Sequence, residues 1–270
     1  MNRLLLVSVV MVLASSTGFA ADVPTVRLHS AGSLRAAMTD IAAAYSAAYG
    51  ITVEAVYGAS GGLGARLAKG EAGDVFTSAD MGYPEALTKA GISGPTVLFA
   101  RNHLCTILRP GLSATPKTVL ATLLRPDIKI GTSSPDNDPG GAYAWAMFQK
   151  ADGVKPGARA TLEAKALKMG SAPGQLSVPP NTKNALVWLF EEKKLDAFLS
   201  YCTGGHTAAE QMPGINTVEL PPELAVSANY GLTVLKSANQ ERAAQFALFI
   251  LSPTGQKLLA EHGFDAPLQP

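Results

Sequence analysis

The sequence predicts an α/β protein of two lobes, each a mixed, mostly parallel sheet flanked by helices. Apolar runs of four to six residues alternate with longer segments of helical period, which is typical of this class. Clusters of Pro and Gly punctuate the chain, but none is long enough to be a flexible linker between independent domains. We therefore expect the chain to cross between the lobes on strands and later to return.

The expected strands are short apolar runs bounded by turn residues. They cover 26–29, 52–57, 75–78, 104–108, 128–131, 197–201 and 231–235. Helical periodicity predicts helices over 34–49, 182–194, 240–251 and 254–262. In the first of these helices Leu34, Met38, Ile41 and Tyr45 form one apolar stripe, which must pack on a sheet.

The first 20 residues have the pattern of a cleaved export signal. Arg3 supplies positive charge, an apolar run follows over 4–13, and Gly18, Phe19 and Ala20 provide a cleavage site. The alternative is a membrane anchor, but the run is roughly half of the about twenty residues that a spanning helix needs. We therefore expect a periplasmic protein.

Charge and cysteine content narrow the possible partners. Loss of residues 1–20 leaves 21 basic and 21 acidic residues, so neither nucleic acid nor an anionic membrane surface is indicated as a partner. Cys105 and Cys202 lack the clustered spacing of a metal site. They form either one disulfide or two separate buried thiols.

A recurring turn is the most informative feature for function. A short strand ends in a small, hydroxyl-bearing turn and a helix begins at once, over 28–34, again over 56–63 and, in a Pro-rich form, over 134–141. Such helix N-termini bind anions because unpaired N–H groups and the positive end of the helix dipole point the same way. One such turn is weak evidence, but several at the carboxyl ends of strands form the expected ligand site of an open α/β sheet.

Several segments resemble, in matching order, the periplasmic molybdate-binding proteins of molybdate ABC importers, a family that binds molybdate or tungstate. They are 31–34, 58–67, 73–80, 138–144, 196–201, 252–256 and 262–264, and Gly-Asp-Val-Phe-Thr-Ser-Ala-Asp at 73–80 is the most specific. The resemblance implies a type II periplasmic-binding-protein fold that closes on its anion through neutral hydrogen-bond donors. Matched residue by residue, these donors fall on Ser33, Ser60, Gly140, Thr182 and Tyr201.

The match has two departures. The second serine is followed by Gly61 and Gly62, which removes a possible hydroxyl donor. Asp138 resembles the archaeal branch of the family, in which this carboxylate helps to coordinate the metal. Asp138 is therefore either a ligand to the molybdenum or tungsten centre or a helix cap turned away from the anion.

Two other functions compete with this interpretation. Residues 58–62 also match the Gly-x-Ser-x-Gly elbow of serine hydrolases, with His262 downstream, although too few strands precede Ser60 for that fold. The binding fold could instead carry sulfate, phosphate or a small organic acid.

The sequence thus predicts a binding protein rather than an enzyme. We expect lobe 1 over 22–100 plus 233–270, lobe 2 over 101–232, and the anion between them. The predicted protein is a monomer without a cofactor, and its partners are the anion and a membrane permease.

Overall fold

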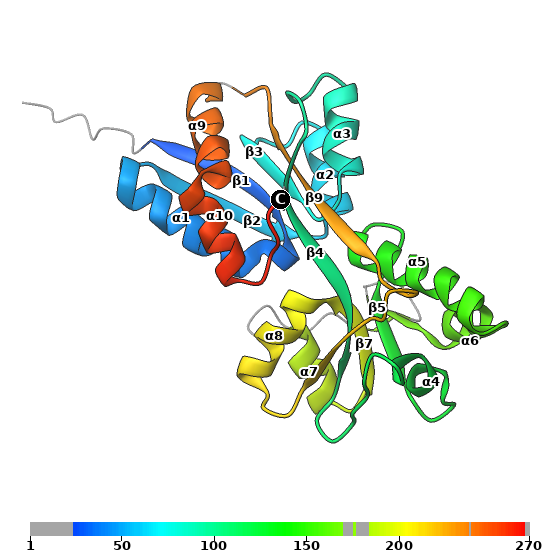
Figure 1. Ribbon diagram of the computed structural model, residues 1–270. Coiled ribbons are helices and arrows are strands. Elements are labelled where there is room, and N and C mark those ends of the chain that lie inside the picture. The colour runs from blue at the N-terminus through cyan, green and yellow to red at the C-terminus, as the bar shows by residue number, and fades with distance from the viewer. Residues whose placement is uncertain (1–23, 170–174, 177–183, 238, 268–270) are drawn as a thin grey trace, which may run out of the picture.

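The first lobe is built on a sheet with the strand order β2-β1-β3-β9-β4. The structure is a computed structural model that describes residues 24–169, 175–176, 184–237 and 239–267, and Figure 1 shows this lobe at the top. Strands β1 and β3 run parallel, as do β1 and β2, whereas β9 is antiparallel to β3 and β4. The strands are β1 (Thr25–Ala31), β2 (Thr52–Gly58), β3 (Val75–Ser78), β4 (Val97–Leu108) and β9 (Ser227–Val234).

The apolar stripe predicted from the sequence covers this sheet. Leu34, Met38, Ile41 and Tyr45 are all 0% exposed, so the stripe is the buried face of the helix, as its period required. The helical elements of this lobe are η1 (Gly32–Leu34), α1 (Arg35–Tyr49), α2 (Ser60–Ala68), α3 (Gly82–Lys89), α9 (Gln240–Leu251) and α10 (Pro253–Glu261).

The second lobe repeats the plan with a second mixed sheet. Strand β5 pairs in parallel with β6 and β7, while β4 pairs antiparallel with β7 and β8. The strands are β5 (Ile130–Ser133), β6 (Leu167–Met169), β7 (Ala197–Tyr201) and β8 (Asn216–Glu219). The helices are α4 (Val119–Leu124), α5 (Pro139–Val154), α6 (Ala158–Lys165), α7 (Ala185–Glu191) and α8 (Cys202–Gln211).

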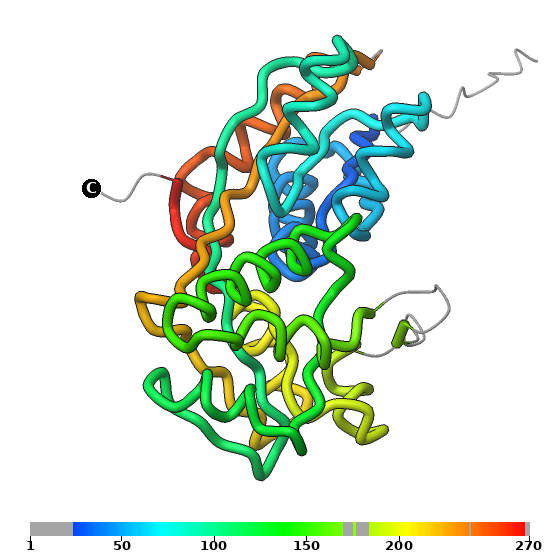
Figure 2. Tube along the Cα trace, turned by 90° about the vertical axis from the view of Figure 1, so that its right-hand side faces the viewer, coloured from blue at the N-terminus to red at the C-terminus, as the bar shows by residue number. Residues whose placement is uncertain are grey.

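Strand β4 belongs to both sheets. It pairs with β9 through His103 and with β7 from Leu104 onward, so a single strand carries the chain from one lobe to the other. Figure 2 shows β4 and β9 running side by side between the lobes, with α5 directly beneath the first lobe. Two strands, β4 and β9, therefore make the connection between the lobes.

The predicted fold class is confirmed, with differences in individual elements. Strand β4 begins at Val97 rather than 104, because the polar residues Arg101, Asn102 and His103 separate its first apolar run, over 97–100, from the predicted one. Strands β6 and β8 and the helices α3, α4, α6 and α8 were not predicted. The start of the predicted helix over 182–194 lies outside the described residues. We keep the predicted lobe boundaries as a proposal.

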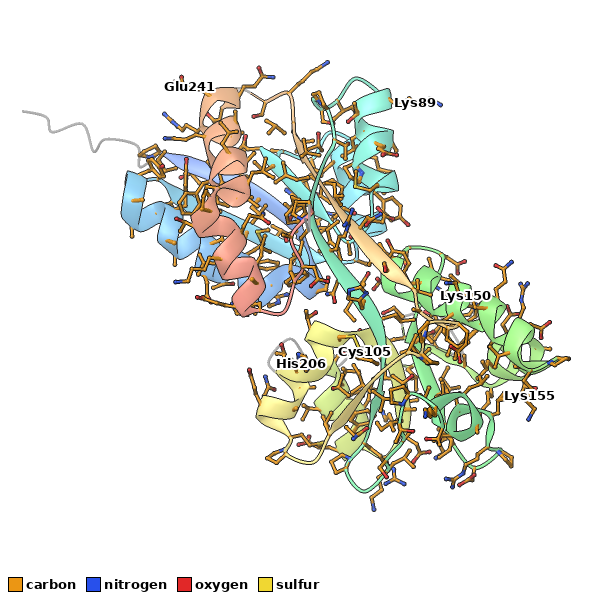
Figure 3. The ribbon with its side chains drawn as sticks, in the orientation of Figure 1. Lys89, Cys105, Lys150, Lys155, His206 and Glu241 are labelled. Carbon is orange, nitrogen blue, oxygen red and sulfur yellow. A yellow bond between two sulfur atoms is a disulfide. The ribbon has the colours of Figure 1, made fainter. Side chains whose placement is uncertain are left out.

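Cys105 and Cys202 form a disulfide, which selects the first of the two predicted alternatives. The bond joins β4 to the first residue of α8, directly after Tyr201. Figure 3 shows Cys105 in the second lobe, close to the point at which β4 enters it. Among the residues described in the two lobes, no helix is long and apolar enough to cross a membrane.

Candidate functional site

The two predicted serines lie at one edge of the first sheet. Strands β1 and β2 are parallel neighbours in a register that pairs Ala31 with Gly58. Ser33 and Ser60 each follow two residues later, Ser33 in the turn before α1 and Ser60 as the first residue of α2. Parallel strands end at the same edge, so the register brings both turns together.

Both serine hydroxyls lie within hydrogen-bonding distance of a protein donor. The Ser60 side chain is part of the buried interior at 1% exposure, and its Oγ accepts a hydrogen bond from the Ala79 N–H at 3.1 Å. The Ser33 Oγ lies 3.1 Å from the Tyr230 hydroxyl. A hydroxyl has one proton, so the accepted bond at Ser60 leaves that proton available for another acceptor.

Tyr201 reaches the same region from the second lobe. It is the last residue of β7 and only 5% exposed, and its hydroxyl has no hydrogen-bond partner among the described residues. Burial raises the pKa of this hydroxyl well above its usual value, so it stays protonated. A buried, protonated hydroxyl without a partner is costly unless a ligand accepts its bond.

Gly140 and Asp138 form the N-terminus of α5. The Gly140 N–H donates to the Asp138 Oδ1 at 2.9 Å, so the carboxylate caps the helix. A Cβ placed on Gly140 would lie 3.6 Å from the Tyr201 Cε2, which puts this terminus beside the tyrosine ring. The Gly140 N–H can donate to a ligand only if its hydrogen bond to Asp138 is broken. The fifth predicted donor, Thr182, lies outside the described residues.

Contacts across the lobes connect these groups. The Tyr143 hydroxyl of α5 donates to the Ala79 carbonyl at 3.3 Å, and the Gly61 N–H donates to the Asn137 carbonyl at 3.1 Å. The Tyr201 ring lies between two others, with its centroid 5.6 Å from that of Tyr230 and 6.2 Å from that of Tyr143. Ser33, Ser60, Gly140 and Tyr201 are thus brought together between the lobes.

The segment over 73–80 supports the site rather than supplying a donor from its own side chains. Asp74 has a fully buried side chain that accepts from the Arg27 backbone N–H at 2.8 Å and from the Ser237 hydroxyl at 2.6 Å. Ala79 positions Ser60, as described above. Asp80 caps α3 by accepting the Tyr83 N–H at 3.1 Å. The segment therefore links β3 to the N-termini of α2 and α3.

Two carboxylates, Asp80 and Asp138, lie near the candidate donors. Burial raises the pKa of both carboxyl groups, and the charge of Asp80 further raises the pKa of Asp138 and that of Tyr143. Sequence reasoning did not single out Asp80, Tyr230 or Asn102; only Asp80 stood in a segment that pointed to the site. The described parts of the chain contain no group of three or more His, Cys, Asp or Glu side chains that could hold a metal ion.

The hydrolase alternative has no support from this geometry. The His262 Nε2 lies 2.8 Å from the Asp40 Oδ2, on the α1 and α10 side of the first lobe. The Ser60 hydroxyl instead contacts the Ala79 N–H. A serine nucleophile needs a base within hydrogen-bonding reach, and His262 is engaged elsewhere.

The family model for bacterial extracellular solute-binding proteins matches residues 26–265. The chain belongs to this family. An uncharacterized protein of Pasteurella multocida is 31% identical to this chain, and the match covers 88% of this chain and 97% of that protein. The molybdate-binding protein ModA of Mycobacterium bovis is 26% identical to this chain, and the match covers 88% of this chain and 83% of that protein.

Two solved structures share the fold of this solute-binding protein. The periplasmic molybdate-binding protein of Azotobacter vinelandii matches with a TM-score of 0.74 and 20% identity, covering 90% of this chain and 100% of that one. The sulfate-binding protein SubI of Mycobacterium tuberculosis matches with the same TM-score and identity, covering 90% of this chain and 87% of that one. The family itself is one of solute-binding proteins, which supports binding rather than catalysis as the function of this chain.

Proposed function

We propose that this solute-binding protein captures molybdate or tungstate between its lobes in the periplasm and delivers it to the permease of an ABC importer. The observation that carries the proposal is the convergence of protonated hydroxyls from both lobes. Ser60 has its oxygen engaged by the Ala79 N–H, and Tyr201 is a buried hydroxyl with no partner among the described residues.

Such donors suit a fully ionised tetrahedral oxyanion. A dianion of this kind has four oxygens that only accept hydrogen bonds, and hydrogen bonds to a charged group are stronger than those between neutral groups. Neutral donors also avoid the cost of burying a cation. The curated ModA relatives and the Azotobacter structure support molybdate as the cargo.

Asp138 places a carboxylate beside the proposed anion site, so its role must be compatible with a bound dianion. A bare carboxylate beside a dianion would repel it, but the Asp138 Oδ1 is engaged by the Gly140 N–H. This contact supports the helix-cap interpretation over metal coordination.

Sulfate is the main rival cargo because it has the same charge and shape as molybdate and differs chiefly in size.

Titration calorimetry of the ligand-free protein with molybdate, tungstate, sulfate and phosphate tests the proposal directly. We expect tight binding of molybdate and tungstate and at least about a hundredfold weaker binding of the other two, a difference of about 2.7 kcal/mol. Tight sulfate binding would change the cargo but keep the oxyanion site. No heat with any of the four anions would refute the proposal.

Ser33→Ala and Ser60→Ala are each expected to weaken molybdate binding by about 1 to 3 kcal/mol, because a charged ligand loses a hydrogen-bond donor. The measurement is the dissociation constant from the same titration. Ser46→Ala is a matched control, since Ser46 lies on α1 of the same lobe, away from the two turns. Unchanged affinity in both site variants would show that the anion binds elsewhere.

A further inference from the structure

A pocket of about 530 Å³ lies on the second lobe, at the edge of the sheet opposite the candidate anion site. Its residues adjoin the amino ends of β5 and β7, whereas Tyr201 ends β7 at the other edge. Asp196 in this pocket precedes Tyr201 by five residues, which separates the two by roughly 16 Å along the strand. We call it the distal pocket, and its lining includes Arg109, Lys129, Phe190, Lys193, Leu195 and Asp196.

The floor of the distal pocket is apolar. Phe190 and Leu195 are only 5% and 1% exposed, and both belong to the apolar cluster that joins α7, β7 and α8. Met212, which directly follows α8, also lines the pocket and packs against the same cluster. A concave site of this volume with an apolar floor is typical of small-molecule binding. The floor therefore fits a ligand with a hydrocarbon body.

The charged groups of the distal pocket are mostly basic. The side chains of Arg109, Lys129 and Lys193 line it together with a single acidic side chain, that of Asp196. This carboxylate is already engaged, because its Oδ1 accepts from the Arg109 Nε at 2.7 Å and its Oδ2 accepts from the Lys129 backbone N–H at 2.9 Å. The ammonium groups of Lys129 and Lys193 form no ion pair with any residue that the structure describes. Both are therefore available to an anionic ligand.

The backbone at Lys193 is a second, independent observation. Among the described residues it is the one non-glycine residue with a positive φ, at 50°. Its N–H donates to the Phe190 carbonyl at 3.1 Å and the Lys194 N–H donates to the Leu189 carbonyl at 3.0 Å, the usual pattern where a helix ends on a left-handed residue. Glycine is favoured there because a Cβ costs free energy in this conformation. Lysine thus supplies a cation to the pocket at a cost in stability, as residues at ligand sites often do.

We propose that the distal pocket binds a small organic anion with an apolar body, such as a medium-chain carboxylate. The carboxylate group contacts the ammonium groups of Lys129 and Lys193. The hydrocarbon chain covers Phe190, Leu195 and Met212. Burial of the chain supplies most of the affinity, because apolar burial contributes more than exposed charged contacts do. The pocket lies within the second lobe, so the inference is independent of the cargo proposed for the site between the lobes.

Titration calorimetry of the protein with octanoate, butanoate and octylammonium tests the proposal. We expect octanoate to bind and butanoate to bind on the order of a hundredfold more weakly, because each of the four missing CH₂ groups contributes about fourfold. Octylammonium has the same chain and the opposite charge, so we expect it to bind at least about tenfold more weakly than octanoate. Saturating molybdate should leave octanoate affinity unchanged, because the two anions occupy different sites.

Lys193→Gly removes one cation and gives the left-handed position the residue that it favours. We expect octanoate binding to weaken by about fivefold, the upper range for an exposed charged contact, without a fall in the thermal unfolding temperature. Lys194→Gln is the matched control. It removes the same charge from the next residue, but the Lys194 ammonium lies over the Trp188 ring, 4.2 Å from its centroid, and does not line the pocket. Its octanoate affinity should equal that of the unaltered protein.

The outcomes decide whether the pocket is a binding site. Octanoate binding that depends on chain length, weakens in Lys193→Gly and is retained in Lys194→Gln supports the inference. No heat with millimolar octanoate, equal binding of octanoate and octylammonium, or equal weakening in both variants would overturn it. Displacement of octanoate by molybdate would place the carboxylate between the lobes and would also overturn it.

Discussion

Gly61→Ala is expected to weaken molybdate binding by about 5- to 150-fold, the equivalent of the roughly 1 to 3 kcal/mol that overpacking costs. A Cβ on Gly61 would lie 2.6 Å from the Asn137 carbonyl oxygen, which belongs to the opposite lobe. It would also lie 2.7 Å from the Tyr83 hydroxyl. The tyrosine side chain can rotate away, whereas the Asn137 oxygen belongs to the backbone, so we expect the lobes to separate.

The expected loss is specific to the closed arrangement of the lobes. The Gly61 N–H donates to the same Asn137 carbonyl at 3.1 Å, so the added methyl group both blocks a contact and breaks a hydrogen bond. A ligand that touches both lobes stabilises the closed state. A variant in which closure costs more free energy must therefore bind the ligand more weakly by the same free energy. Small-angle scattering should show a larger radius of gyration for the variant.

Gly62→Ala is the matched control. A Cβ on Gly62 meets nothing within 4 Å, and both glycines lie in the first turn of α2. The two substitutions therefore change helix propensity alike, by at most about 1 kcal/mol in favour of the helix. Equal affinities in the two variants would show that the contact between Gly61 and Asn137 does not limit binding.

Reduction of the disulfide is expected to lower the free energy of unfolding by about 4 kcal/mol. Cys105 and Cys202 are 97 residues apart, and a link that closes so long a loop removes much of the entropy of the unfolded chain. The bond lies beside the candidate tyrosine, since Cys202 directly follows Tyr201 and Cys105 pairs with Ser200 across β4 and β7. Urea unfolding with and without reductant measures the difference.

The double variant Cys105→Ala with Cys202→Ala isolates this effect. The chain has only two cysteines, so a reductant should shift the unfolding midpoint of the unaltered protein and leave that of the variant unchanged. An unaltered protein with the same midpoint in both conditions would contradict the expected stabilisation.

The sequence by itself determined several elements of both lobes and the two serine turns. The stripe from Leu34 to Tyr45 and the strands over 75–78 and 197–201 follow from local periodicity, and the structure agrees with each. The serine turns were visible because a strand, a small residue and a helix start are adjacent in sequence. Local patterns of this kind need no knowledge of the fold.

Only the tertiary structure decided which groups act on those turns. Tyr230 lies 197 residues from Ser33, and Asn102 lies 128 residues from Tyr230, so no spacing in the sequence relates them. Gly61, which the sequence suggested only as the loss of a hydroxyl, lies where the Asn137 carbonyl of the other lobe approaches too closely for a side chain. The hydrogen-bond partner of a side chain and the closeness of two lobes depend on atoms that the fold brings together, so they are absent from any local pattern.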